Sequence, residues 1–497
     1  MIVIGAGING AGIARDAAMR GLKVLLIDKS DIASGTSSAS TRLIHGGLRY
    51  LEHFEFGLVR ESLRERETLL RIAPHLVRPL PITIPIYKQG QRGAVTIRAG
   101  MIVYDLLSFT KSLPRHLMLS RRETLEQLSG LNPEGLLGSA LYFDAQVEFA
   151  ERLVLENVLS ASEHGAEVYT YAAVTNLIVE NEKVAGIEFV GDEGQKQLAR
   201  ASVIINASGP WVDYLLDEAP FESPKLIGGT KGSHVVVVPF AGAPATAIYL
   251  EAESDKRPFF IIPWNGNYLI GTTDVRFDDD PDQVRSELWE IDYLLGETNR
   301  AFPEARLTRE RVLYMYSGVR PLPVTGEKDE QSITRRHFIR EHPRLSNLLS
   351  IVGGKLTTYR SLAEECVDLI FRKLGRPSPA CVTAKQVLPG AVNFSSFAME
   401  FKGPSRLLRV YGSRASQVTK LNEDAFTAEM LFAFKHELAK TLADCFLRRT
   451  MIGLDSDRGL NHLAAAAEIG RQYLGWTEER ARHEVEDYPY SSVKIRG

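Results

Sequence analysis

The chain has 497 residues, 24% of them charged and 44% hydrophobic, with a formal net charge of -3 at pH 7. This length exceeds what one hydrophobic core usually supports, so we expect two or three domains. The nearly balanced charge gives no reason to expect nucleic-acid binding. Cys366, Cys381 and Cys445 are far apart and form no CxxC pattern, so we expect neither a disulfide framework nor a metal site.

The apolar segments indicate the cellular location of the protein. The N-terminal apolar run is short and lacks a basic lead, so we expect no signal peptide, and whether the native start lies upstream of Met1 stays open. The longest uncharged stretch, residues 235–250, is interrupted by prolines, so we expect no transmembrane helix. We therefore expect a cytoplasmic protein.

The most informative segment lies at the N-terminus. An apolar run at residues 2–4 is followed by GAGING at residues 5–10, a helical stretch, a second apolar run at residues 24–27, and Asp28. This order of strand, glycine turn, helix, strand and acid is the context in which GxGxxG binds a dinucleotide. We therefore predict an α/β, Rossmann-like domain.

Each residue of this fingerprint has an expected role. Gly5 permits the tight turn, Gly7 lets the backbone approach a pyrophosphate, and Gly10 lets the helix pack close to the strand. Asp28 is placed to accept a hydrogen bond from a ribose hydroxyl, and its carboxylate would repel a 2′-phosphate. The fingerprint alone does not distinguish NAD from FAD.

Later segments narrow the choice of cofactor. The hydroxyl-rich sequence SGTSSAST at residues 34–41 is followed by LIHGGLRYL at residues 43–51. Together with GAGINGAG, these segments resemble the FAD-dependent glycerol-3-phosphate dehydrogenases, within the superfamily of glycine oxidase and D-amino-acid oxidase. The sequences KGSH, GTTD, SGVRPL and GGKLTTYR match later in the same order, so the resemblance covers nearly the whole chain.

The resemblance implies a discontinuous Rossmann-like FAD-binding domain, an inserted, mainly antiparallel β substrate domain and a C-terminal helical domain. The expected ranges are 1–80, 140–215 and 347–385 for the FAD-binding domain, 81–139 and 216–346 for the substrate domain, and 390–497 for the helical domain.

The resemblance also implies FAD bound non-covalently. The residues expected to contact it are Gly5, Gly7, Ile8, Asn9, Gly10, Asp28, Lys29, Thr36, Ser37, Ser38, Ser40, Leu43, His45, Gly46, Gly47, Val174, Ala207, Gly209, Trp211, Gly354, Lys355, Leu356 and Thr357.

A second glycine turn, at Gly353 and Gly354, precedes a helix that we expect to begin near Thr357. In the related flavoproteins this helix end lies beside N1 and O2 of the isoalloxazine. The positive end of a helix stabilises the negative charge that flavin reduction places there. The resemblance therefore places FAD between two glycine turns.

A phosphorylated substrate needs cations held in fixed positions. Arg320, in SGVRPL, matches the arginine that grips the anionic end of the substrate in the superfamily, and a guanidinium binds phosphate bidentately. Arg49, Arg335 and Lys355 complete the expected cluster, and we expect Tyr50 to donate its hydroxyl. For Arg335 a structural salt bridge stays an equal alternative.

Oxidation of a secondary alcohol removes a hydride from carbon and a proton from oxygen. A base with a near-neutral pKa assists the proton transfer. We expect His234 to be this base, His45 to contact flavin or substrate, and Arg320 to take part in catalysis. A structural role for either histidine stays an alternative.

The resemblance implies oxidation of sn-glycerol 3-phosphate to dihydroxyacetone phosphate, with electrons passing to a membrane quinone. Alternatives are an oxidase that uses dioxygen, a related amine or 2-hydroxyacid oxidase, and an FAD-binding assembly protein without catalysis. The extra mid-chain segment that the resemblance implies for oxidases is not evident, which favours the dehydrogenase. The oligomeric state stays open.

Three other segments carry expectations. Residues 93–120 predict a core-packing helix; an amphipathic surface resting on anionic lipid at the inner face of the cell membrane is the alternative. The prolines in residues 81–87 predict an edge strand. We expect Arg448 and Arg449, in the helical tail, to form a solvated charge pair, although contact with the FAD-binding domain or lipid stays open.

Overall fold

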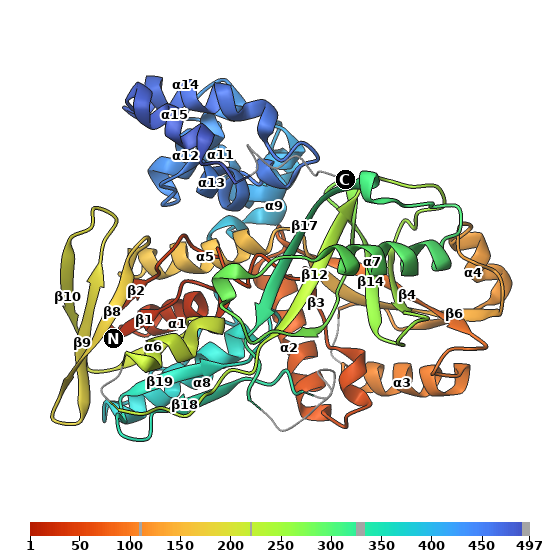
Figure 1. The fold of residues 1–497 in the computed structure, drawn as a ribbon, viewed down its shortest axis with the longest axis horizontal. Coiled ribbons are helices and arrows are strands. Elements are labelled where there is room, and N and C mark those ends of the chain that lie inside the picture. The colour runs from red at the N-terminus through yellow and green to blue at the C-terminus, as the bar shows by residue number, and fades with distance from the viewer. Residues whose placement is uncertain (109–111, 219–220, 325–332, 490–497) are drawn as a thin grey trace.

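The chain folds into an α/β part, a large β-sheet and a helical C-terminal part (Figure 1). The computed structural model describes residues 1–108, 112–218, 221–324 and 333–489. Within these ranges, none of the helices combines the length and apolar character needed to cross a bilayer.

The α/β part is built around a six-stranded sheet in which β18 alone runs antiparallel to its neighbour, among the described strands. Its central strands are short apolar runs buried on both faces, as parallel strands covered by helices require. In spatial order the strands are β18 (Phe338–Glu341), β19 (Leu348–Val352), β11 (Ile204–Asn206), β1 (Ile2–Ile4), β2 (Leu25–Ile27) and β7 (Glu167–Tyr169).

Both faces of this sheet are covered. Helices α1 (Ile8–Met19), α5 (Ala150–Glu163) and α8 (Tyr359–Lys373) pack on one face. Helix α6 (Val212–Asp217) and a small three-stranded sheet cover the other. Because β1, β2, β11 and β19 are parallel, their carboxyl ends lie at the same edge of the sheet, which is where a doubly wound sheet binds its ligand. The small sheet consists of β8 (Ala173–Glu180), β9 (Lys183–Val190) and β10 (Lys196–Arg200).

The second sheet is mainly antiparallel, although β13 and β4 pair in parallel. Its strands are β16 (Val275–Arg276), β12 (Thr230–Val237), β15 (Asn267–Gly271), β14 (Pro258–Trp264), β13 (Ala247–Glu251), β4 (Val77–Tyr87), β6 (Leu136–Val147) and β3 (Leu43–Ile44), with β17 (Val312–Arg320) beside β12 and β5 (Leu117–Ser120) beside β6. The helices packed around it are α2 (Phe56–Ile72), α3 (Ala94–Leu107), α4 (Arg121–Gln127) and α7 (Leu288–Ala301).

Strand β4 corrects one expectation from the sequence. The prediction of an edge strand is wrong, because β4 pairs with β6 along its length and with β13 on its other side. The prolines fit because β13 pairs only with Ile82 and Thr83 of β4. The expected boundaries at 80/81 and 139/140 fall inside β4 and β6, and we propose boundaries nearer to Val77 and Val147. Like the other domain boundaries, they stay a prediction.

The C-terminal part is helical and lies over α5, on the side of the molecule away from α3 (Figure 1). The predicted α/β class, inserted antiparallel sheet and C-terminal helical domain are therefore confirmed. The helices of the C-terminal part are α9 (Phe394–Glu400), α10 (Ser405–Tyr411), α11 (Ala415–Val418), α12 (Ala425–His436), α13 (Leu442–Asp444), a π-helical turn (Cys445–Arg449), α14 (Leu463–Tyr473) and α15 (Glu478–Glu486).

Candidate functional site

Two adjacent cavities lie between the glycine turn after β1 and the large sheet. One, of about 670 Å³, is at the carboxyl ends of the parallel strands, and the other, of about 290 Å³, is against the large sheet. Thr36, Ser40, Gly354, Lys355 and Leu356 line both cavities, so we describe the two together as one cleft. We call them the fingerprint end and the sheet end of the cleft.

The geometry of the glycine turn explains its sequence. Gly5 has φ +105°, which a residue with a side chain rarely adopts. A Cβ on Gly10 would lie 1.8 Å from the carbonyl oxygen of Gly5, so only glycine lets α1 pack this closely against the turn. Gly7 lines the cleft, and the Ile8 amide donates to Ser37 Oγ at 3.0 Å. The turn therefore presents backbone directly to the cleft.

Asp28 follows β2 and lines the fingerprint end, as its place in the sequence predicts. Its carboxylate accepts from the Ala6 amide at 2.6 Å and from the Ser30 amide at 2.8 Å. Burial raises the pKa of Asp28 to about 6, against the effect of these two hydrogen bonds. A carboxylate has about four acceptor positions, so Asp28 keeps capacity for a ribose hydroxyl.

Most residues expected to contact the cofactor line this cleft. Three do not: Gly10 packs beneath the turn, Ser38 Oγ donates to the Gly35 carbonyl at 2.9 Å, and the Gly46 amide donates to Tyr104 Oη at 2.9 Å. The residues that line the cleft are Gly5, Gly7, Ile8, Asn9, Asp28, Lys29, Thr36, Ser37, Ser40, Leu43, His45, Gly47, Val174, Ala207, Gly209, Trp211, Gly354, Lys355, Leu356 and Thr357.

Buried polar atoms without partners show what kind of ligand fits the cleft. Among the described residues, Asn9 Oδ1, Trp211 Nε1 and His234 Nδ1 are buried without a hydrogen-bond partner, and all three side chains line the cleft. Such atoms usually find a partner, so they favour a ligand that carries both donors and acceptors. The cleft thus fits an extended dinucleotide such as FAD.

The sheet end is organised around Arg320, at the end of β17. Arg320 Nη1 lies 2.9 Å from Asp274 Oδ1, and Nη2 donates to Thr272 Oγ1 at 3.0 Å. Arg335 Nη2 lies 3.0 Å from the other oxygen of Asp274. A Cβ on Gly232, in KGSH, would lie 2.1 Å from Arg320 Nη2, so this glycine makes room for the guanidinium. The structure therefore brings Arg320 and Arg335 together.

The sheet end carries an excess of positive charge. Among the described residues that line it, Asp274 is the only carboxylate. Burial tends to raise the pKa of Asp274, but Arg320 and Arg335, together with Thr230 and Arg49, outweigh this and hold it below its ordinary value. Burial also lowers the pKa of Arg320 and of Lys355. Two cations of the sheet end have a carboxylate partner outside the lining, Arg42 with Glu151 and Arg257 with Asp255. The other cations are Arg49, Arg320, Arg335 and Lys355.

Lys355, Arg49 and Tyr50 meet on one wall of the sheet end. Lys355 Nζ donates to Ser62 Oγ at 2.9 Å and lies 4.6 Å from the centre of the Tyr50 ring. The guanidinium of Arg49 lies 5.9 Å from the same ring. The Tyr50 ring therefore holds two cations beside the cleft.

His234 lies on β12 in the wall of the sheet end. Its Nε2 is 2.9 Å from Thr41 Oγ1, and its ring stacks on Tyr316 with the ring centres 4.9 Å apart. Burial, together with the charges of Arg320 and Arg42, lowers the pKa of His234 to about 3. This is well below the near-neutral value that we expected from the sequence.

His45 has the same electrostatic character. Its side chain is partly buried, and its amide donates to Thr357 Oγ1 at 3.2 Å. Burial, followed by Lys355 and Arg49, lowers its pKa to about 3. Both histidines are therefore neutral at physiological pH, and a cation flanks each of them.

Sequence reasoning missed several residues of the sheet end. Thr272 and Asp274 belong to GTTD, which carries the resemblance but received no role, although an acid beside a predicted arginine cluster is a usable signal. Arg257 lies just before β14, where no motif marks it. Tyr249 and Phe260 line the cleft from β13 and β14, and alternation along these strands is the signal that finds them.

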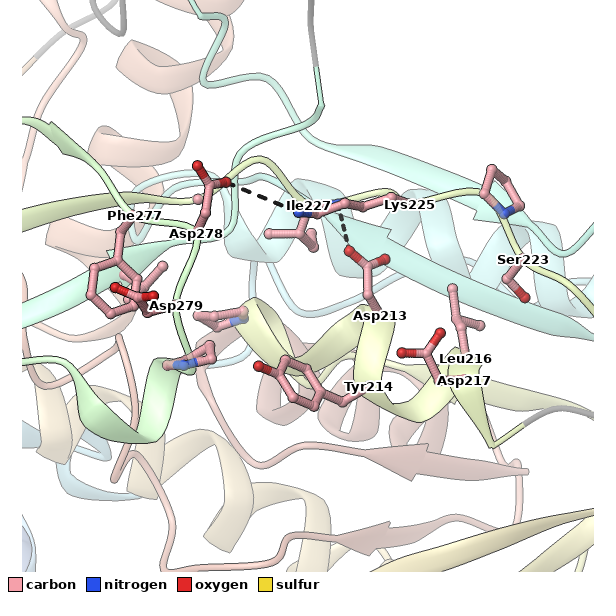
Figure 2. A pocket seen from close by; sticks show the side chains of 15 residues that line it. Asp213, Tyr214, Leu216, Asp217, Ser223, Lys225, Ile227, Phe277, Asp278 and Asp279 are labelled. Atoms are coloured by element: carbon pink, nitrogen blue, oxygen red, sulfur yellow. Dashed lines mark hydrogen bonds and ion pairs between the residues drawn. The ribbon is translucent and has the colours of Figure 1, made fainter.

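A separate acidic pocket of about 280 Å³ lies beside the fingerprint end (Figure 2). Its Asp213 points at the backbone and accepts from the amides of Leu226 and Ile227 at 2.9 and 3.0 Å. Lys225 and Asp278 approach to 4.0 Å across it. These groups hold the chain that leads from α6 to the large sheet, so we assign the pocket no ligand.

Two family models match successive parts of the chain. The family described as FAD dependent oxidoreductase matches residues 1–368. The chain belongs to this family. The family described as the C-terminal domain of alpha-glycerophosphate oxidase matches residues 381–481. The chain is therefore an FAD-dependent oxidoreductase with a C-terminal helical module, and the expected cofactor is confirmed.

Similar proteins cover nearly the whole chain. The glycerol-3-phosphate dehydrogenase of Synechocystis sp. is 48% identical, over 98% of this chain and 95% of the relative. The D-erythritol 1-phosphate dehydrogenase of Brucella abortus is 38% identical, over 90% and 93%. The structure of the glycerol-3-phosphate dehydrogenase from Bacillus halodurans, complexed with FAD, matches with a TM-score of 0.79 at 28% identity, over 100% and 96%.

Proposed function

We propose that this FAD dependent oxidoreductase oxidises sn-glycerol 3-phosphate to dihydroxyacetone phosphate. The observation that carries the proposal is the excess of cations over carboxylates at the sheet end, beside two neutral histidines. Relatives with the name glycerol-3-phosphate dehydrogenase support it. FAD, when bound, supplies the acceptor for the hydride.

The cations bind and orient the phosphate of the substrate. Arg320 contributes a fixed positive charge, because its Nη1 and Nη2 groups donate to Asp274, Thr230, Thr272 and the Thr273 carbonyl, which hold the guanidinium in place. Arg335 and Lys355 add charge from other directions. A phosphate near neutral pH carries a charge of about -1.5 to -2, so one cation would leave it only partly neutralised. The cluster therefore selects a phosphate over a single carboxylate.

His234 accepts the proton of the substrate hydroxyl, and Thr41 holds its ring through Nε2. Its pKa of about 3 results mainly from burial and, to a smaller extent, from the charges of Arg320 and Arg42. A bound phosphate dianion offsets the positive charge of Arg320 and raises the pKa of His234 towards the range of a useful base. Proton acceptance thus depends on a bound phosphorylated substrate.

The second glycine turn places a helix end beside the cleft. Gly353 and Gly354 have positive φ, and α8 begins at Tyr359, two residues later than predicted. Leu356 and Thr357 line the cleft between the turn and the helix. The partial positive charge of the α8 N-terminus would stabilise the negative charge that reduction places on the isoalloxazine of FAD.

We propose that the outer side of α3 contacts the membrane. We also propose that a membrane quinone is the electron acceptor. α3 buries Ile97, Met101 and Tyr104 but leaves Val95 84% and Leu106 68% exposed. This arrangement combines the two alternatives from the sequence, because one side packs on the protein and the other is apolar and open. We propose a peripheral protein at the cytoplasmic face of the membrane.

A flotation assay with anionic lipid vesicles tests this contact. The double variant Val95→Glu and Leu106→Glu should stay at the bottom of the gradient while the wild type floats. Leu198→Glu is the matched control, because Leu198 is 67% exposed on β10 and outside the proposed contact. Equal flotation of the double variant and the control would remove the proposal.

Anaerobic addition of glycerol 3-phosphate to the yellow holoprotein tests the proposed reaction. We expect the visible band of the flavin to bleach and to return on addition of a quinone analogue. Faster recovery in air than with the quinone analogue would show an oxidase, and no bleaching would show an FAD-binding protein without this activity. Because one relative is named D-erythritol 1-phosphate dehydrogenase, erythritol 1-phosphate is the second substrate to compare.

A further inference from the structure

The C-terminal helical domain reaches the cofactor part through two arginines. Arg449 donates to both carboxylate oxygens of Asp31, at 2.7 and 2.9 Å, and Arg448 Nε donates to the same carboxylate at 2.5 Å. The side chains of Arg449 and Asp31 are fully buried. The expected solvated charge pair at Arg448 and Arg449 is therefore wrong, because a carboxylate of another domain lies against both.

A second contact joins the same helical segment to another loop. Asp444, at the end of α13, accepts from Arg448 at 2.7 Å and from the hydroxyl of Tyr171 at 2.5 Å. Tyr171 lies between β7 and β8, and its amide donates to the Ser30 carbonyl at 3.2 Å. We call Asp31, Tyr171, Asp444, Arg448 and Arg449 the anchor cluster.

Both loops held by the anchor cluster line the fingerprint end of the cleft. Residues on either side of Asp31 do so, namely residues 28–30 and 34–37, while Asp31 itself does not. On the other loop, residues 172–174 follow Tyr171 directly and form the facing wall. The Ala33 amide also donates to the Ala6 carbonyl at 3.1 Å, which ties the first loop to the glycine turn.

We propose that Arg449, Arg448 and Asp444 are positioning residues for FAD. They hold the two loops at the distance that the adenosine half of the cofactor requires, without touching it themselves. The charges within the cluster are matched, since Arg449 and Arg448 outweigh the effect of burial and hold the pKa of Asp31 below its ordinary value. A loop fixed in this way loses less conformational freedom when FAD binds, and preorganisation of this kind raises affinity.

The same domain interface contains a control contact. Glu437, after α12, accepts from Arg152 on α5 at 2.5 and 2.9 Å, and both side chains are fully buried. Among the described residues, α5 contributes none to the lining of the cleft. Arg449 Nε also donates to the backbone carbonyl of Glu437 at 2.6 Å, a bond that Glu437→Gln keeps. Loss of the Glu437 charge should therefore weaken the interface without moving the cofactor loops.

Titration of the full-length apoprotein with FAD, followed by flavin fluorescence, tests the proposal. Arg449→Met should raise the Kd for FAD about tenfold or more, as loss of an outer partner that orients a binding group typically does. Glu437→Gln should lower the melting temperature of the apoprotein but leave the Kd for FAD within about twofold of wild type. Equal Kd values for these two variants would overturn the proposal.

Two further variants keep the test decisive if Arg449→Met folds poorly. Tyr171→Phe removes one hydroxyl and its hydrogen bond to Asp444, and should raise the Kd for FAD about threefold to tenfold. Asp31→Asn, alone and combined with Arg449→Met, forms a double-mutant cycle. The change in binding free energy of FAD in the double variant should be smaller than the sum of the changes in the two single variants. An unchanged Kd in Tyr171→Phe, or strict additivity in the cycle, would contradict the proposal.

Discussion

Arginines gather in two regions of this protein with opposite balances of charge. At the domain interface each buried guanidinium meets a carboxylate, as in Arg449 with Asp31 and Arg152 with Glu437. At the sheet end of the cleft, Arg320 and Arg335 share the single carboxylate of Asp274, among the described lining residues. The charges of these interface pairs are balanced, whereas the sheet end has an excess of positive charge.

The comparison shows that a buried arginine by itself does not mark a binding site. Buried ion pairs are common structural features, and losing one partner of such a pair is costly to stability. A ligand is indicated where cations outnumber carboxylates beside a cavity, because charge left unpaired there is available to an anion. Substitutions in the two regions should therefore affect different properties of the protein.

The largest effect is expected for Arg320→Met. Loss of the guanidinium fork should reduce kcat/KM for glycerol 3-phosphate about 1,000-fold, equivalent to about 4 kcal/mol of transition-state binding. The melting temperature should change little, because the side chains of Arg320 and Asp274 are 23% and 11% exposed, Asp274 keeps Arg335 as a partner, and the loss relieves repulsion between Arg320 and its neighbouring cations. Steady-state kinetics and thermal unfolding measure the two quantities. A reduction of kcat/KM by less than about tenfold would contradict the role of Arg320 in phosphate binding.

His234→Asn should act on the proton transfer rather than on phosphate binding. Loss of a general base lowers kcat about 100-fold or more, while the KM for glycerol 3-phosphate should change much less than in Arg320→Met. The measurement is the rate of anaerobic flavin bleaching at saturating substrate. A variant with wild-type kcat would show that another group accepts the proton.

At the interface, Arg152→Met should show the reverse pattern. It leaves the buried carboxylate of Glu437 with Arg414 as its remaining partner, at 2.7 Å, and should cost about 3 kcal/mol of stability. The kcat/KM should stay within about threefold of wild type, because Arg152 lies outside the cleft. A large loss of kcat/KM at an unchanged melting temperature would contradict this assignment.

The smallest effect concerns acid stability. His234 has a folded-state pKa of about 3, below its ordinary value of about 6.5, so the unfolded chain binds a proton more readily. Stability is therefore lost as the pH falls below about 6.5 towards 3, by about 2 kcal/mol near pH 5. His45 should behave alike. Asp31 has a lowered pKa, so its contribution is lost only below about 4.

Thermal unfolding of the apoprotein at about pH 7 and about pH 5 measures this effect. The melting temperature of His234→Asn should fall less between the two pH values than that of wild type, because the variant lacks one group that takes up a proton on unfolding. Identical decreases would mean that His234 is accessible to protons in the folded protein.

The sequence predicted features that depend on local chemistry. The turn at Gly5, the acid Asp28 at the end of β2 and the helix after Gly354 follow from short-range rules for glycine turns and strand ends. The family resemblance added Arg320, Arg49 and Lys355, which all line the cleft.

Features that depend on distant partners escaped the sequence. Arg449 looks like a surface residue until Asp31, 418 positions away, lies against it. The prolines of β4 suggest an edge until β13 is seen to pair with two residues only. The pKa of His234 depends on burial and on Arg320, which lies on another strand. In each case the decisive contact is a tertiary one that no local pattern records.

The central claim is that the unpaired charge of the sheet end selects a phosphorylated alcohol for oxidation. Anaerobic stopped-flow comparison of glycerol 3-phosphate with glycerol, by the second-order rate of flavin bleaching, tests it most directly. The account predicts a preference for glycerol 3-phosphate of at least about 1,000-fold, which should fall by more than about tenfold in Arg320→Met. Equal rates with the two alcohols, or a preference unchanged in the variant, would contradict it.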